Sequence, residues 1–339
     1  MAPCSAPVVR RLAATVCLAL AVLGQPALAA TLKIATVAPD GSSWMDRIRA
    51  GAAEIAERTE NRVTFRFYPG GVMGDDAAVV RKIRLGQLQG AALTTGALQK
   101  FYTDVQLYNL PMLFRDHAEV DAVRAELDPV LLAGLEEAGW VAFGFGEAGF
   151  AYAMSQQPAR TPEEARALKV WAPADDPGAL AALEGFGIRP VPLAIADVLA
   201  GLQTELVEAV AVPPVASLAL QWYTQLDYLL EVPLMYIYGT LALDAKVFAR
   251  LSEPDRAVVR EVMGRTFAEL SAESRRDHAG ALEALRGQGI EFLTPDADAL
   301  AAWREGARRA RARMVEAGTI TPGMHARVTE LLEAIRSAP

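Results

Sequence analysis

The sequence predicts an α/β protein of two lobes, in which helices flank mixed, mostly parallel sheets. The first reason is that short apolar β-runs alternate with amphipathic helical segments, a pattern typical of parallel sheets with helices on both faces. The second reason is length. About 310 of the 339 residues remain once an N-terminal leader is set aside, and this exceeds what one hydrophobic core usually organises.

Strands and helices alternate through the first half of the chain. The expected strands span residues 32–37, 63–67, 90–94 and 140–145, and the expected helices span 44–60, 75–85 and 118–138. In the first helix, Met45, Ile48 and Ala52 recur at spacings of three and four residues, which places them on one face. We therefore expect consecutive β-α-β units.

The pattern changes after Phe150, where we expect the chain to cross into the second lobe. Thr161 is a typical N-cap and Pro162 a typical first helical residue, so a helix should begin there. Further expected strands span 151–155, 169–172, 207–212, 241–246 and 291–292, and further expected helices span 179–186, 197–202 and 253–287, before two terminal helices. The helix at 253–287 is long enough to pack across both lobes.

The first 30 residues have the features of a secretory signal peptide. Two arginines at 10–11 precede an apolar run at 12–23, and small residues at 27–29 follow. The run is too short for a membrane anchor, which needs about 18 or more apolar residues. We expect export, with cleavage after Ala29 or Ala30.

Both cysteines, Cys4 and Cys17, lie inside this leader, so the mature chain has no thiol for a disulfide, a zinc site or catalysis. Cys17 follows the bulky Val16, whereas a lipidated cysteine follows a small residue, so we expect a soluble product. The mature chain has 31 basic and 41 acidic residues, a net charge of −10. Such a surface does not favour nucleic acid or anionic membrane.

Gly144, Gly146 and Gly149 match the spacing of a dinucleotide-binding fingerprint. That motif requires a helix directly after the glycines, because the helix N-terminus holds the pyrophosphate. Here the segment 150–154 has extended character. We interpret the glycines as a flexible crossing between lobes.

The histidines and paired acids form no recognisable catalytic cluster. His117, His278 and His325 are far apart, without a carboxylate or thiol at ligand spacing, so they are expected at the surface and neither a metal nor a cofactor is predicted. The acidic pair at 75–76 begins a helix, where acids favour the dipole, and the pair at 175–176 lies in a Pro-bounded loop. Both pairs are expected as solvated loop or cap residues.

Aromatic residues are concentrated at 222–223 and 236–238. Their spacing alone is typical of a core. However, Tyr236 and Tyr238 precede Gly239, where we expect the chain to return to the first lobe, so both are also candidates for a ligand site between the lobes.

Several blocks of the mature sequence resemble the DctP-type solute-binding proteins of TRAP (tripartite ATP-independent periplasmic) transporters. These blocks span residues 32–39, 67–75, 84–88, 107–114 and 190–208, so the likeness covers nearly the whole mature chain. The segment 192–204 is the most specific, because an acidic residue and Leu202-Gln203-Thr204 follow a Pro-rich strand.

The resemblance implies a periplasmic protein with the type II periplasmic-binding-protein fold and no enzymatic activity. Lobe I would comprise 31–150 and 240–285, and lobe II 151–239 and 286–339 with the C-terminal helices. Crossing strands and the long helix would join the lobes, which would close over one ligand about glycines at 144, 146, 149 and 239. The implied partners are the small and large membrane subunits of a sodium-coupled permease and, in one subgroup, a tetratricopeptide-repeat protein.

The chain departs from the family at three polar ligand contacts. Most members carry a carboxylate-binding Arg where this chain has Trp171, a second Arg aligns near Ala151, and the pocket Asn aligns with Val212. The ligand-binding residues implied by the alignment are Trp171, Val212, Ile195, Leu199, Thr94, Thr95, Val37, Glu147, Phe150, Tyr236 and Tyr238. A carboxylate buried there without a cation would be costly, so we expect a substantially apolar or aromatic ligand unless Arg189 or Arg115 reaches into the pocket.

Two other functions stay open on the sequence alone. A ligand-binding sensor or scavenging protein of the same fold would need no transporter, and no sequence feature separates it from a transport component. An enzyme of this fold is disfavoured by the absence of a mature Cys and of any cluster of His and acids.

The leader generates the first testable prediction. The mature chain isolated from the producing cells should begin at Ala30 or Thr31, because signal peptidase cleaves after small residues. N-terminal sequencing measures this directly. A start far from these residues, or a lipid on Cys17, would contradict the prediction.

Overall fold

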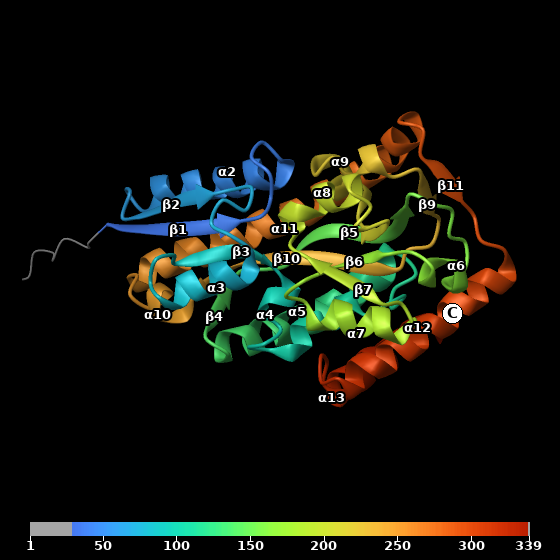
Figure 1. Cartoon of the computed structure of the whole chain (residues 1–339). Helices are drawn as coiled ribbons and strands as arrows, with labels where there is room; N and C mark the ends of the chain where they lie inside the picture. Colours follow the sequence, from blue (N-terminus) through green and yellow to red (C-terminus); the bar gives the residue numbers. More distant parts are fainter. Residues whose placement is uncertain (1–28, 338–339) are drawn as a thin grey trace, which may run out of the picture.

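The computed structural model describes residues 29–337. The predicted signal peptide therefore lies outside the described residues, apart from Ala29 and Ala30. The predicted two-lobed α/β architecture is confirmed, since helices flank a mixed sheet in each half of the molecule and long strands run between the halves (Figure 1). Among the described residues the strands form one continuous 11-stranded sheet, with the principal order β2-β1-β3-β10-β5-β8-β6-β7.

The first half is built from β-α-β units, as the sequence predicts. Strand β1 (Ala30–Thr36) lies between β2 (Val63–Tyr68) and β3 (Gly90–Thr94) and is parallel to both. The connecting and covering helices are α2 (Ser43–Arg58), α3 (Asp76–Arg84), α4 (Thr95–Leu98), η1 (Thr103–Asn109) and α5 (His117–Glu137). A short strand, β4 (Trp140–Ala142), pairs with β10.

The second half repeats this plan around β6 (Val170–Pro173). This strand lies parallel to both β7 (Pro190–Leu193) and β8 (Ala209–Val212). The surrounding elements are α6 (Pro162–Arg166), α7 (Pro177–Gly185), η2 (Ile195–Asp197), α8 (Val198–Gln203), α9 (Pro214–Ala219), η3 (Trp222–Gln225), β9 (Tyr228–Leu230) and β11 (Glu291–Leu293). The capping box predicted at Thr161 is present, with Glu164 as its partner.

Two ten-residue strands connect the halves. Strand β5 (Gly146–Ser155) pairs antiparallel with β10 (Met235–Asp244), and the register shifts between Ile237 and Tyr238. At one end β10 pairs with β3, and at the other end β5 pairs with β8. Because β5 continues as a strand to Ser155, no helix follows the glycines at 144–149, and the dinucleotide interpretation is excluded.

Three C-terminal helices tie the halves together. Helix α11 (Glu253–Gly287) has the predicted bounds and packs against α2, β5 and α9. Helix α12 (Ala297–Glu316) packs against α7, whereas α13 (Pro322–Ser337) packs against α5 and η1, which belong to the predicted lobe I. The predicted lobe limits at 150/151 and 239/240 fall inside β5 and β10, and the division itself stays a prediction.

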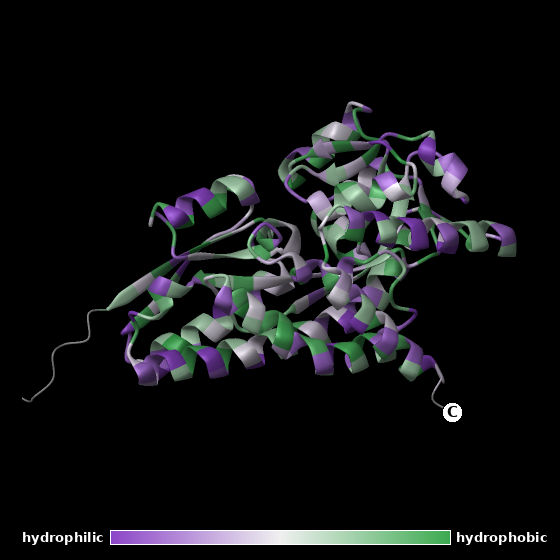
Figure 2. Cartoon of the chain, turned by 90° about the horizontal axis from the view of Figure 1, so that it is seen from below, coloured by the Kyte–Doolittle hydropathy of each residue, from purple (hydrophilic) through white to green (hydrophobic). Residues whose placement is uncertain are grey.

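The outer helices are amphipathic. Figure 2 shows hydrophilic and hydrophobic residues alternating along them, while the strands inside carry mostly apolar residues. Helix α2 illustrates the pattern, since Met45, Ile48 and Ile55 are buried against the sheet as predicted. The shorter elements α4, η1, α9 and β9 were not predicted, because segments of three to seven residues carry too little periodicity to be read from sequence.

A buried carboxylate organises the start of the crossing strand. Glu147 is 1% exposed and accepts hydrogen bonds from Arg124 Nη1 at 2.7 Å, from Arg275 Nε at 2.7 Å and from Arg275 Nη2 at 2.6 Å. Arg124 belongs to α5 and Arg275 to α11. The side chain of Glu147 therefore connects both helices to the crossing strand β5.

Both arginines have further acidic partners. Arg124 pairs with Asp128 at 2.9 Å and donates to the Phe145 carbonyl at 2.7 Å, and Arg275 donates to Asp121 at 2.9 Å. Although burial opposes its charge, Asp128 and Glu147 raise the pKa of Arg124, and Asp121 and Glu147 raise that of Arg275. The charges in this network therefore compensate one another.

Replacing Glu147 tests the role of this network. Glu147→Gln should lower the free energy of unfolding by about 3 kcal/mol, because it leaves two positive charges without their shared carboxylate. Urea unfolding of the ligand-free protein measures the loss. The control Glu269→Gln removes a half-exposed carboxylate that pairs with Arg47, and stability should scarcely change. Equal effects of the two variants would contradict the assignment.

Candidate functional site

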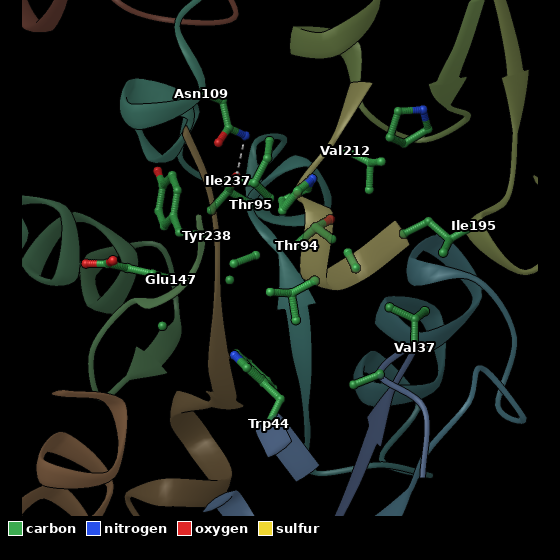
Figure 3. A pocket seen from close by; sticks show the side chains of 18 of the residues that line it. Val37, Trp44, Thr94, Thr95, Asn109, Glu147, Ile195, Val212, Ile237 and Tyr238 are labelled. Atoms are coloured by element: carbon green, nitrogen blue, oxygen red, sulfur yellow. Dashed lines mark hydrogen bonds between the residues drawn. The ribbon is translucent and has the colours of Figure 1, made fainter. Parts of the chain in front are cut away.

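A cavity of about 330 Å³ lies between the two halves of the molecule and is lined from both (Figure 3). From the first half, the wall is formed by the segment after β1, the start of α2, the end of β3 and the end of η1. From the second half, the wall is formed by β6, β8, α7 and α9, and the middle of α11 also lines it. The crossing strands form the side where the halves meet.

Most of the predicted ligand residues lie in this wall. Those that line the cavity are Val37, Thr94, Thr95, Glu147, Trp171, Ile195, Val212 and Tyr238. Phe150, Leu199 and Tyr236 lie outside it. The ligand-binding role of the wall residues stays a prediction.

The three residues outside the wall pack elsewhere. Phe150 and Tyr236 are buried against each other, with ring centroids 5.1 Å apart, and both contact His117. Leu199 packs against the apolar core of the second half. Burial beside Glu147 raises the pKa of Tyr236, so this phenol stays neutral.

The wall is apolar at two of the three positions where the family resemblance expects ligand-binding polar groups, and the third, Ala151, lies outside the wall. Trp171 is 8% exposed, donates its indole N–H to the Leu193 carbonyl at 3.0 Å and packs edge-to-face on Trp222 with centroids 5.1 Å apart. Val212 is 5% exposed and ends β8. The indole therefore offers a ligand its apolar surface rather than a donor.

The charged side chains of the wall are all acidic. They are Glu147, Asp176, Glu273 and Asp277, and no Lys or Arg lies among the described residues that line the cavity. Arg189 and Arg115, which the sequence left open as substitutes, are both exposed and outside the wall. A ligand carboxylate would therefore meet no side-chain cation and several carboxylates.

A polar cluster, consisting of Gln99, Gln106, Asn109 and Asp176, connects the halves beside the cavity. Gln106 Nε2 donates to Asp176 at 2.8 Å and to Gln99 at 3.1 Å, while the Gly178 backbone N–H donates to Gln99 at 3.0 Å. Asn109 donates to Thr95 and Gln106. Gln99 and Gln106 come from the first half and Asp176 from the second, so these bonds hold the halves together.

The solvated position expected for Asp176 is wrong. Asp176 caps α7 as a loop residue can, accepting from the Ala179 N–H at 3.0 Å, but it is only 7% exposed. Burial raises the pKa of its carboxyl. This burial could not be predicted from the sequence, because Gln99 and Gln106 approach Asp176 from the other half of the molecule.

The surface position expected for His278 is also wrong. His278 lies on the inner face of α11, 8% exposed, with its ring 5.8 Å from that of Tyr152, and burial lowers its pKa. Gly149 allows this approach, since it adopts a φ of +102° and a Cβ there would stand 3.2 Å from His278 Nδ1. Within the described residues no group of three or more His, Cys, Asp or Glu is arranged to hold a metal ion.

The carboxylate of Asp76 is hydrogen-bonded to Thr94, a residue of the cavity wall. The Thr94 hydroxyl lines the cavity and donates to Asp76 at 2.8 Å. Burial raises the pKa of Asp76 to about 6, despite the hydrogen bond from Thr94. Its neighbour Asp75 caps α3, as the sequence predicts for this pair.

A cavity enclosed by two lobes on crossing strands defines a ligand-binding protein. The sequence profile of the bacterial extracellular solute-binding protein family 7, DctP, matches residues 34–317. The chain therefore belongs to the DctP family, and the resemblance seen in its sequence is confirmed. These TRAP solute-binding proteins are periplasmic, non-enzymatic transport components that bind small molecules and deliver them to membrane permease subunits.

Individual relatives are distant but cover most of the chain. The C4-dicarboxylate-binding periplasmic protein DctP of Rhodobacter capsulatus is 25% identical over 297 residues, which is 84% of this chain and 86% of the relative. A solute-binding protein of Verminephrobacter eiseniae is 24% identical over 245 residues, 71% of this chain and 72% of the relative.

Solved structures show the same fold. A TRAP periplasmic solute-binding protein from Desulfovibrio salexigens with bound orotic acid superposes with a TM-score of 0.82 at 17% identity, covering 90% of this chain and 99% of that one. A protein of the same kind from Xanthobacter autotrophicus with bound β-D-galacturonate gives 0.81 at 17% identity, covering 89% and 99%. The type II fold is thereby confirmed. Among the described helices, none is long and apolar enough to cross a membrane.

The Asp76 carboxyl generates a pH prediction. Its pKa of about 6 exceeds the value of about 3.9 in an unfolded chain, so its stabilising contribution is full below pH 4 and is lost as the pH rises through 6. Asp76→Asn cannot titrate. The free energy of unfolding of the wild type, relative to that of Asp76→Asn, should therefore fall by about 2 kcal/mol between pH 4 and pH 7.

Urea unfolding of both proteins at each pH measures this difference. Asp75→Asn is the control, because it keeps a capping side chain at the neighbouring position. Its free energy of unfolding should fall between pH 4 and pH 7 by the same amount as that of the wild type. A difference between the wild type and Asp76→Asn that does not vary with pH would contradict the prediction.

Proposed function

We propose that this protein captures a substantially apolar or aromatic small molecule in the cavity between its lobes and delivers it to a sodium-coupled TRAP permease. The family supports capture and delivery to membrane subunits. The nature of the ligand rests on the wall itself, because Trp171 and Val212 replace the polar contacts that the resemblance implies and both line the cavity.

The absence of a lining cation is the observation that carries this proposal. A bound carboxylate needs a charged or densely hydrogen-bonded partner once it leaves water, and none of the described lining residues is Lys or Arg. The printed names of several relatives refer to organic acids as ligands, such as C4-dicarboxylates and orotic acid. We infer that this chain uses the family's fold for a different class of solute.

The proposed partners follow from the family. The small and large subunits of a TRAP permease would receive the ligand, and a tetratricopeptide-repeat protein is a further proposed partner. The leader at 1–30 supports a periplasmic site of action. A neighbouring gene for a protein of about twelve transmembrane helices would support transport, and its absence would favour a sensor.

Ligand-driven closure provides a general test. A natively extracted sample should retain the ligand, which mass spectrometry can identify. Adding that ligand to the stripped protein should reduce the radius of gyration in small-angle scattering and raise the melting temperature. A saturating ligand that changes neither would contradict the assignment of the cavity.

Trp171 provides the test of ligand class. Trp171→Ala removes aromatic surface from the wall and should weaken binding of the native ligand by at least tenfold, since comparable truncations cost about 2 to 4 kcal/mol. Calorimetry with C4-dicarboxylates, sialic acid and uronic acids against apolar acids and aromatic compounds should favour the latter two groups.

The control for this test is Trp171→Phe, which keeps an aromatic ring and should retain most of the affinity. Circular dichroism should confirm that all variants are folded, because Trp171 also contacts Trp222. Micromolar or tighter binding of a small dicarboxylate, unaffected by Trp171→Ala, would overturn the proposed ligand class.

A further inference from the structure

Several polar side chains of the cavity wall have already committed their donors to other protein groups, whereas lining hydroxyls such as those of Thr95 and Ser274 have not. The hydroxyl of Thr94 donates to Asp76 at 2.8 Å, that of Ser42 to the Pro39 carbonyl at 2.8 Å, and that of Tyr238 to the Val105 carbonyl. The amide of Gln106 donates to Asp176 and Gln99. These groups have no proton left for a ligand.

The three indoles of the wall differ in this respect. The N–H of Trp171 donates to the Leu193 carbonyl. The N–H of Trp222 makes no hydrogen bond to a described residue, but this ring lies edge-to-face against Trp171 and is only 2% exposed. Trp44 is partly exposed, and its N–H makes no hydrogen bond with any described residue that meets ordinary geometry. Figure 3 shows its indole reaching from α2 toward the middle of the cavity, with the nitrogen on the side away from the helix.

The Trp44 ring is held in place by the crossing strands and α11. It packs edge-to-face on Phe267, with centroids 5.7 Å apart and planes at 84°. A Cβ on Gly146 would stand 3.1 Å from Trp44 Cζ2, so the absence of a side chain there allows the ring to lie on the β5 backbone. This packing therefore fixes the position of the Trp44 indole N–H.

The charges around the cavity decide which acceptor suits this donor. Of the four lining acids, Glu147 is paired with Arg124 and Arg275 and Glu273 with Arg47, which leaves Asp176 and Asp277 without a cationic partner. No Lys or Arg among the described lining residues would compensate an anionic acceptor. An uncharged oxygen, such as a carbonyl, needs no such compensation and satisfies the indole N–H.

We propose that Trp44 orients the ligand by donating its indole N–H to an uncharged acceptor oxygen on an otherwise apolar molecule. This inference rests on the proposed function, and it adds the chemical group by which the ligand is recognised. Trp171 supplies apolar surface from the second lobe, and Trp44 supplies the polar contact from the first.

The test uses three probes with the same ring. Acetophenone has a carbonyl, ethylbenzene has none, and benzoate is an anion; apolar cavities of this order of size accept such molecules. The stripped full-length mature protein should bind acetophenone about 3- to 10-fold more tightly than ethylbenzene in calorimetry, the gain expected from one neutral hydrogen bond. Trp44→Phe should abolish that preference and keep ethylbenzene binding, whereas Trp171→Phe should keep the preference.

Nuclear magnetic resonance of the wild type gives a readout that does not depend on any variant folding. The chain has five tryptophans, and Trp44→Phe identifies the indole signal of Trp44. Acetophenone should move that indole proton downfield, and ethylbenzene should not. The indole of Trp171, already bonded to Leu193, should respond less.

The outcomes separate this inference from the proposed function. Equal binding of acetophenone and ethylbenzene, or a preference that survives Trp44→Phe, would overturn the role of Trp44 and leave the apolar ligand class standing. Benzoate binding more tightly than both neutral probes would overturn the uncharged acceptor and leave the apolar or aromatic ligand class standing. No binding of any of the three probes would count against the proposed ligand class and this inference with it.

Discussion

The buried carboxylate of Glu147 is the constraint on which the arrangement of the two lobes depends. A charge that is 1% exposed is tolerated only when it is fully compensated, and here Arg124 and Arg275 provide three hydrogen bonds. Because these arginines come from α5 and α11, compensating one charge fixes the start of the crossing strand between two helices. The same pairing removes Glu147 as a free anion in the cavity wall, so this residue contributes shape more than charge to the site.

The strands that cross between the lobes, β5 and β10, also form part of the cavity wall. Gly146 on β5 leaves room for Trp44, and Gly149 leaves room for His278 of α11, while a Cβ on Gly239 of β10 would stand 2.9 Å from the Leu93 carbonyl oxygen. Side chains at Gly146 and Gly149 would crowd the indole and the long helix against β5. Trp44 of the cavity wall therefore rests on the crossing strand β5, which connects the two lobes.

The fold of this family does not determine the polarity of its cavity. Relatives with TM-scores of 0.81 and 0.82 share the arrangement of strands at 17% identity, and the printed names of those proteins include acidic ligands. In this chain the wall places Trp171 within β6 and Val212 at the end of β8, with acids as its only lining charges among the described residues. The strand pairing that holds the scaffold is made by backbone groups, so the chemistry of the wall can vary while the fold is kept.

The sequence alone determined the α/β pattern, the bounds of α11 and the presence of Trp171 in the pocket-forming strand, because periodicity and local motifs are properties of neighbouring residues. Tertiary structure alone decided which side chains meet. Gln99, Gln106 and Asp176 lie up to 77 residues apart in the sequence and are brought together only when α4 and η1 face α7. Tyr236 and Tyr238 alternate along β10 and are buried in the same core cluster, yet only Tyr238 lines the cavity. Trp44 gave no signal in the sequence, since its position depends on Gly146, which lies about 100 residues further along the chain.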